Sequence, residues 1–330
     1  MDFSILPKVE LHVHLDCSLS YQVVQLLNPG IRPEQYRAEF VAPAKCAGLA
    51  DYITRAAKGI ELMQTETALQ LVTLDLFSQL QADHVAYAEI RFAPFEHLQG
   101  GLSPEAVVQA VCAALAEAFR QTGIPAGLLL CTLRHYDAAK SMATVRLADQ
   151  FRSSGVVGFD IASDEAGYPV DAHIAAFDYA FTRGIPCTAH AGEARGADSV
   201  WETLRYFHPR RIGHGVRSME DSALLDFLKQ HHIHLEVCPT SNIQTNVYGA
   251  ISDHPVDRLF RAGLSIGINT DGRTISNTTL ATEYRQLQDV FQWEKAQLLQ
   301  CNRNAIEAAF APDELKAALR ERLAAAWGWK

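Results

Sequence analysis

The chain has 330 residues, of which 48% are hydrophobic and 20% are charged, so its composition is that of an ordinary globular protein. Its formal net charge of −9 and the lack of a long Lys/Arg cluster argue against DNA or RNA as a partner. The seven cysteines are dispersed, the start has no cationic and apolar leader, and no apolar run could cross a bilayer, so we expect a cytoplasmic protein that contacts no membrane.

Short β-rich runs alternate with longer amphipathic stretches along the chain. Eight runs are expected to be strands: residues 8–14, 84–92, 126–133, 156–162, 186–190, 211–214, 233–237 and 265–270. Stretches with apolar residues at helical spacing are residues 104–121, 142–151, 172–182, 220–231 and 255–262. This alternation favours parallel βαβ units, and eight of them predict an α/β chain with a single (β/α)8 TIM barrel, one domain over residues 1–330.

Two segments are longer than a plain βαβ unit requires. Residues 17–80 separate the first two expected strands and predict a helical insertion after strand 1. An insertion there would lie at the catalytic end of the barrel and act as a lid. Residues 294–330 are rich in Ala and Leu and predict C-terminal closing helices.

The first chemical signal is the pair His12 and His14, which ends the first expected strand. Alternate residues of a strand face the same side, so both imidazoles can reach one point. His190, His214 and Asp271 also stand at the ends of expected strands. Because the C-terminal ends of parallel barrel strands meet at one face, these five residues predict a single site.

Three imidazoles and one carboxylate suit a catalytic Zn²⁺ site that keeps one position for water. We expect one zinc ion per chain, held by His12, His14, His190 and Asp271. Zinc lowers the pKa of a bound water molecule to about 7. His214 and Glu193 then remain for proton handling, His214 as a base or an orienting group and Glu193 as an acid.

Six short segments together carry a family resemblance. They are residues 10–16 (ELHVHLD), 158–165 (GFDIASDE), 190–193 (HAGE), 211–215 (RIGHG), 236–242 (EVCPTSN) and 269–271 (NTD). The chain resembles the adenosine deaminase family of the amidohydrolase superfamily in these motifs and in their order. The resemblance covers nearly the whole length of the chain. The resemblance implies a zinc barrel for purine salvage, which hydrolyses adenosine or 2′-deoxyadenosine to inosine or 2′-deoxyinosine and ammonia.

The resemblance also implies residue roles. Glu193 would protonate purine N1, and His214 would orient or deprotonate the zinc-bound water. Asp16 would contact the ribose hydroxyls of a small purine nucleoside, and the backbone N–H of Ser163 would donate to purine N3. The zinc ligands would be the four already inferred: His12, His14, His190 and Asp271.

Three positions depart from the family pattern, and all three belong to substrate recognition. Gly272 stands where many members have a second Asp that contacts purine N7. Cys17 and Ser163 each replace a glycine. Asp160 and Glu165 flank Ser163, and each is either a substrate contact or part of a structural ion pair. His234 and Glu236 are interpreted as ordinary strand residues, because no Pro-Cys-x-x-Cys follows them as in cytidine deaminases.

Several alternatives stay open. In the first alternative, the substrate is another 6-aminopurine, such as adenine, aminodeoxyfutalosine or an N6-modified nucleotide. Asp16 weighs against a nucleotide, because a carboxylate suits hydroxyls and repels phosphate. The second is a two-metal amidohydrolase, which usually needs a carboxylated Lys that residues 158–165 lack. The third is a non-catalytic barrel that binds zinc or a nucleoside. No oligomeric state follows from the sequence.

Overall fold

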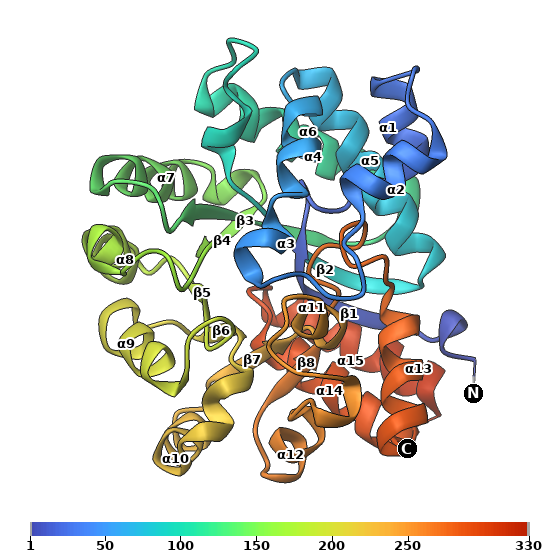
Figure 1. The fold of residues 1–330 in the computed structure, drawn as a ribbon, viewed down its shortest axis with the longest axis vertical. Coiled ribbons are helices and arrows are strands. Elements are labelled where there is room, and N and C mark those ends of the chain that lie inside the picture. Colours follow the sequence, from blue (N-terminus) through green and yellow to red (C-terminus); the bar gives the residue numbers. More distant parts are fainter. Residues whose placement is uncertain (1, 329–330) are drawn as a thin grey trace.

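A computed structural model describes residues 2–328 and places eight parallel strands at the centre of a ring of helices (Figure 1). Each set of four strands pairs in chain order. The first set is β1 (Lys8–His14), β2 (Val85–Phe92), β3 (Ala126–Leu133) and β4 (Val156–Ala162). The second set is β5 (Thr188–Ala191), β6 (Arg211–His214), β7 (His234–Val237) and β8 (Ile266–Ile268).

Isolated bridges join the two four-stranded sheets at both edges. Phe159 of β4 pairs with Cys187, which directly precedes β5. Val13 of β1 pairs with Asp271, which follows β8, and the Asp271 N–H donates to the carbonyl oxygen of His12 at 2.9 Å. The strands thus run round a complete ring, and the predicted (β/α)8 fold is confirmed.

Helices cover the outside of this ring, and Figure 1 shows α7, α8, α9 and α10 following one another along its rim. The helices that connect strands include α5 (Glu66–Ala82), α6 (Pro104–Thr122), α7 (Ala138–Gln150), α8 (Ile174–Arg183), α9 (Ala197–Phe207), α10 (Ser222–Gln230), α11 (Pro239–Gln244) and α12 (Val256–Arg261). After β8 come α13 (Leu280–Phe291), α14 (Lys295–Ala308) and α15 (Asp313–Trp327). Short 3₁₀ turns are η1 (Phe3–Ile5), η2 (Pro94–His97), η3 (Arg152–Ser154), η4 (Asp171–His173), η5 (Val216–Glu220) and η6 (Ile251–Asp253).

The long segment after β1 contains four extra helices before the barrel helix α5. They are α1 (Tyr21–Leu27), α2 (Pro33–Phe40), α3 (Leu49–Ile53) and α4 (Ala56–Leu62). Side chains of α3 line a cavity together with His14 from the end of β1, so this helix lies over the C-terminal ends of the strands. The helical insertion is therefore present where the sequence predicts it, at the catalytic end of the barrel.

The barrel interior is filled with paired charges rather than with apolar side chains alone. Arg91 of β2 donates to Asp160 of β4 and to Glu236 of β7, each at 2.8 Å, and all three are fully buried. Because these strands are not neighbours, the contacts cross the inside of the barrel. The apolar core instead lies between strands and helices, where alternate strand residues such as Val9 and Leu11 are buried.

Several boundaries differ from the expectation by a few residues. β2 begins at Val85 because His84 has a left-handed backbone with φ of 54°. α7 begins at Ala138, four residues earlier than expected, because the Asp137 side chain caps it by accepting from the Lys140 N–H. Helices α9, α11 and α13 lie outside the stretches that helical spacing identifies in the sequence. Closing helices α14 and α15 are present as predicted, although residues 329–330 of that stretch lie outside the described residues. Across residues 2–328 every helix is too short or too polar to span a bilayer.

Candidate active site

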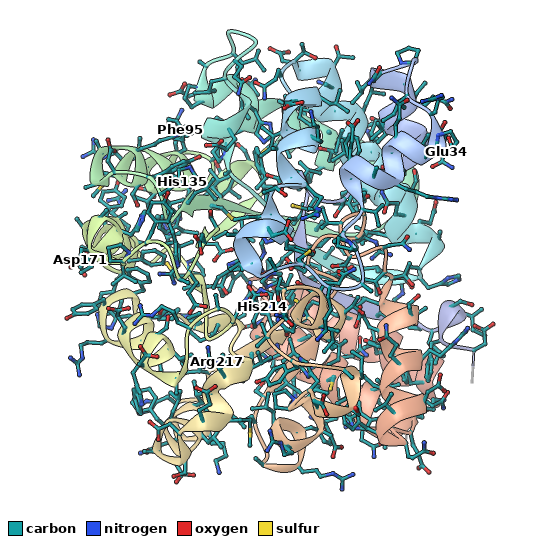
Figure 2. All side chains as sticks on the ribbon, in the orientation of Figure 1. Glu34, Phe95, His135, Asp171, His214 and Arg217 are labelled. Atoms are coloured by element: carbon teal, nitrogen blue, oxygen red, sulfur yellow. The ribbon has the colours of Figure 1, made fainter. Side chains whose placement is uncertain are left out.

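A cavity of about 400 Å³ opens at the C-terminal ends of the strands. Its floor carries predicted site residues from β1, β5, β6 and the segment after β8: His14, Asp16, His190, Glu193, His214 and Asp271. The apolar side chains of Leu49, Tyr52 and Ile53 from α3 form one wall. Figure 2 shows His214 close to the middle of the molecule, whereas Glu34 and Asp171 lie at its rim.

The predicted metal ligands converge on one point. The Nε2 atoms of His12 and His14 each lie 3.4 Å from Oδ1 of Asp271. The Nε2 atoms of His14 and His190 are 3.2 Å apart. One ligand atom each from His12, His190, His214 and Asp271 also falls within 4.8 Å of all the others. The structure therefore brings four histidines and one carboxylate together.

These residues fit a divalent cation. The buried Nε2 of His12 has no hydrogen-bond partner among the described residues, although an unpaired buried polar atom is unfavourable. One oxygen of Asp271 accepts a hydrogen bond from the Ser241 hydroxyl at 2.6 Å, which leaves the other oxygen facing the imidazoles. Imidazole nitrogens and a carboxylate are the donors that Zn²⁺ and related ions prefer. The cluster is thus a divalent metal site.

Carboxylates behind the cluster orient two of the imidazoles. Nδ1 of His12 donates to Glu236 at 2.8 Å, and Nδ1 of His190 donates to Asp160 at 3.3 Å. Arg91 bridges the two carboxylates. Each bond turns the Nε2 lone pair of its histidine toward the cluster, as is usual behind metal ligands. Asp160 and Glu236 therefore matter to the site, although the sequence left the first open and suggested an ordinary strand position for the second.

The electrostatics of the cluster suit a cation. Burial raises the pKa of Asp271, but its interactions with the neighbouring histidines outweigh burial and hold that pKa well below its ordinary value. Burial lowers the pKa of His14 and His214. These shifts favour an ionised Asp271 and neutral imidazoles at His14 and His214, the forms that bind a metal.

Glu193 lies beside this cluster in a different environment. One of its oxygens accepts from Asn242 at 3.3 Å and from the Thr245 hydroxyl at 3.1 Å, and the other lies 3.4 Å from Nε2 of His214. Burial, followed by the negative charges of Asp271 and other carboxylates, raises the pKa of Glu193 well above its ordinary value. This environment favours the protonated form of Glu193, which can donate its proton.

A second carboxylate shapes the turn that carries Glu193. Glu165 accepts the backbone N–H groups of the four consecutive residues 192–195, at 2.6 to 3.0 Å, and also the Ser199 hydroxyl. Gly192 has φ of 69°, and a Cβ there would lie 2.6 Å from Cγ2 of Val200, so the turn requires glycine. These contacts favour a structural role for Glu165 over a substrate contact, although its partners are backbone amides and a hydroxyl rather than a cation.

Of the three predicted substrate contacts, Asp16 and Ser163 line the cavity and Gly272 does not. Asp16 lines the cavity with 8% of its surface exposed, and burial raises its pKa to about 6. Ser163, which directly follows β4, also lines the cavity and has a left-handed backbone with φ of 85°. Gly272 is not part of the wall: a Cβ on it would lie 2.7 Å from Cβ of Cys17, and the wall at this point is Cys17.

Comparisons with known proteins agree with this arrangement. Residues 7–326 match the sequence model of the family described as adenosine deaminase. A relative from Clostridium acetobutylicum, named adenosine deaminase, is 35% identical over 325 residues, which are 96% of this chain and 97% of the relative. A solved adenine deaminase from Arthrobacter aurescens superposes with a TM-score of 0.88 at 26% identity, covering 97% of this chain and 98% of that one. The solved Arabidopsis N6-mAMP deaminase gives a TM-score of 0.88 at 27% identity, covering 98% and 99%.

Proposed function

Because the chain belongs to the adenosine deaminase family of the amidohydrolase superfamily, we propose that it uses one zinc ion to hydrolyse adenosine and 2′-deoxyadenosine. The products are inosine or 2′-deoxyinosine and ammonia. That the chain is an aminohydrolase follows from the family itself. The observation that carries the proposal is the position of Glu193, a carboxyl group buried beside a convergent His/Asp metal site, where its pKa is raised.

Each residue then has a role. Zinc, when bound by His12, His14, His190 and Asp271, supplies a water nucleophile of lowered pKa. Glu193 holds a proton in the cavity and gives it to the ring nitrogen next to the attacked carbon, which makes that carbon more electrophilic. His214, with Nε2 at 3.4 Å from Glu193, contacts the attacking water. The Ser163 backbone and Asp16 orient the purine and its sugar.

The charge of the cavity supports a nucleoside over a nucleotide. Among the described residues that line it there is no Lys or Arg, whereas Asp16, Glu96 and Asp164 line it. A phosphate group would meet these carboxylates without a compensating cation. A buried carboxylate such as Asp16, which accepts a hydrogen bond from the Cys17 thiol at 3.5 Å, suits sugar hydroxyls instead.

Turnover of a small purine panel tests the proposal. Metal analysis of the purified chain should give one equivalent of zinc. Absorbance assays on that protein should then show adenosine and 2′-deoxyadenosine as much better substrates than adenine or AMP. A higher kcat/KM for adenine would transfer the activity to the free base, and a preference for AMP or N6-methyl-AMP would contradict the argument from charge.

Replacing Glu193 by Gln tests the assignment of the acid. The variant should keep its zinc, because Glu193 is not among the proposed ligands. Its kcat should fall by about 10² to 10⁴-fold, since an amide has no proton of suitable acidity to give. The matched control is Glu202→Gln. Glu202 lies on the neighbouring helix α9, where its carboxylate pairs with Arg195, and its loss should leave kcat unchanged. Wild-type turnover in Glu193→Gln would assign the acid to another residue.

The proposal also covers the whole chain. We propose one domain over residues 1–330 and a cytoplasmic location. The continuous ring of strands supports the first, and seven cysteines that are all free support the second. Limited proteolysis that released two stable halves would contradict the single domain.

A further inference from the structure

A chain of hydrogen bonds starts at a backbone amide outside the cavity. The N–H of Val256, at the start of α12, donates to Nδ1 of His254 at 3.1 Å. A backbone amide can only donate, so Nδ1 of His254 must be the acceptor. Burial lowers the pKa of His254 to about 3, so this imidazole is neutral at pH 7. Its proton is therefore on Nε2.

The next bond fixes the orientation of a side-chain amide. Nε2 of His254 lies 3.1 Å from Oδ1 of Asn242 and donates to it. The Nδ2 group of Asn242 must then face the other way. It lies 3.1 Å from Nδ1 of His214 and 3.3 Å from Oε1 of Glu193. With its oxygen turned to His254, Asn242 can only donate to both partners.

The last bond sets the proton of His214. Because Asn242 donates to Nδ1, that nitrogen carries a lone pair. An imidazole with a lone pair on Nδ1 has its one N–H on Nε2. Nε2 is the atom that faces the cluster, 3.4 Å from Oε2 of Glu193. His214 thus presents an N–H to the cavity.

His12 and His190 show the opposite arrangement. Their Nδ1 atoms face the carboxylates of Glu236 and Asp160, which accept hydrogen bonds. Their Nε2 atoms therefore carry lone pairs, which a metal ion requires. By distance alone His214 would also serve as a ligand, since one of its nitrogens lies within 4.8 Å of the ligand atoms of His12, His190 and Asp271. Only the partner on Nδ1 separates it from them.

We propose that His254 and Asn242 are positioning residues that hold His214 as the Nε2–H tautomer, so that His214 donates a hydrogen bond to the attacking water and does not bind the metal. The catalytic part of this inference rests on the proposed function. Since Nε2 already carries a proton, it does not accept the one that the water loses. Glu193 first gives its own proton to the ring nitrogen and then accepts the proton that the water loses. As the C–O bond forms, the ring thus gains one proton and Glu193 regains one.

Nitrogen NMR tests the tautomer without any turnover. The protein is labelled with [¹⁵N]histidine and loaded with zinc, and the His214 signals are assigned by comparison with His214→Gln. We expect a pyrrole-type Nε2 that is coupled to a proton, and a pyridine-type Nδ1. A protonated Nδ1 on His214 in the wild-type protein would overturn the proposal. If no 6-aminopurine is turned over, the proposed function fails, while this measurement still decides the tautomer.

Variants of the two positioning residues extend the test. In Asn242→Asp, a carboxylate of the same shape accepts from both histidines, so the His214 proton should move to Nδ1. In His254→Phe, the amide loses the bond that orients it, and His214 should show both tautomers. The matched control is His234→Gln, which removes another buried neutral histidine at the start of β7 and should leave the His214 signals unchanged. An unaltered Nε2–H signal in Asn242→Asp would overturn the relay.

Kinetics separate positioning from simple damage to the fold. His254 does not line the cavity, so His254→Phe should keep KM within about threefold and its zinc content unchanged. Its kcat should fall by roughly 10- to 100-fold, the usual effect of removing a residue that orients a site group. A kcat equal to that of His234→Gln would show that the tautomer of His214 does not matter to the reaction.

Discussion

Cys17 and Gly272 share one space at the edge of the cavity, although each departs separately from the family pattern. A Cβ at position 272 would lie 2.7 Å from Cβ of Cys17 and 3.2 Å from its carbonyl oxygen. The first distance is too short for two carbon atoms, so a side chain at 272 needs a smaller residue at 17. The two substitutions therefore form one change in the wall of the substrate site.

Adding a methyl group at position 272 tests this coupling. Gly272→Ala should lower the free energy of unfolding by about 1–3 kcal/mol, because the Cβ overpacks against Cys17. Cys17→Gly/Gly272→Ala should recover at least about 1 kcal/mol relative to the sum of the single changes. Urea unfolding of the zinc-loaded variants measures both. Gly48→Ala, at a glycine with no heavy atom within 4 Å of the added Cβ, is the control. Additive single and double variants would show that the two positions are independent.

The turn between β5 and α9 shows how one carboxylate can organise an element. Glu165 accepts hydrogen bonds from four consecutive backbone N–H groups and one hydroxyl, and only 2% of its surface is exposed. Successive backbone amides that point to one place form a strong site for an anion. The Glu193 N–H is one of these donors, so Glu165 fixes the backbone from which the proposed acid projects.

Glu165→Gln tests that role at the level of the turn. The amide has only one acceptor oxygen, so its NH₂ group must face backbone donors, and each lost charge-assisted bond weakens the turn by about 1.5–3 kcal/mol. We expect a lower kcat and faster hydrogen exchange at the amides of residues 192–195. Glu202→Gln breaks a side-chain pair with Arg195 and leaves these backbone bonds intact, so its exchange should match wild type. Protected amides in Glu165→Gln would argue against the role.

At the scale of the whole molecule, the fold buries neutral histidines away from the metal cluster as well as in it. Burial lowers the pKa of His97 to about 4 and that of His234 to about 3, from an ordinary value of 6.5. The unfolded chain therefore takes up protons below pH 6.5 that the folded chain does not yet bind. Stability is unaffected by these groups above pH 6.5 and is lost as the pH falls toward their folded pKa values.

A comparison of pH profiles isolates one of these histidines. Between pH 6.5 and about 4, His97 should lower the free energy of unfolding by up to about 1.4 kcal/mol per pH unit. His97→Asn keeps a donor for the carbonyl oxygen of Met63 and has no group that titrates. The difference in the free energy of unfolding between wild type and variant should therefore change with pH through this window and be constant above it. Loss of the metal at low pH affects both proteins and cancels in this difference. Parallel profiles down to pH 4 would contradict the prediction.

Sequence alone determined the order of strands, the barrel, the helical insertion and the residues at the strand ends. Local patterns suffice for these, because apolar periodicity identifies each element and parallel strands must bring their C-terminal ends to one face. Tertiary structure decided which side chains stand behind the site. Glu236 reaches His12 from 224 residues away, and Glu165 reaches the turn of Glu193 from 28 residues away. Only the folded chain shows that an amide faces His214 while carboxylates face His12 and His190, and that difference in hydrogen bonding gives identical imidazoles different chemical roles.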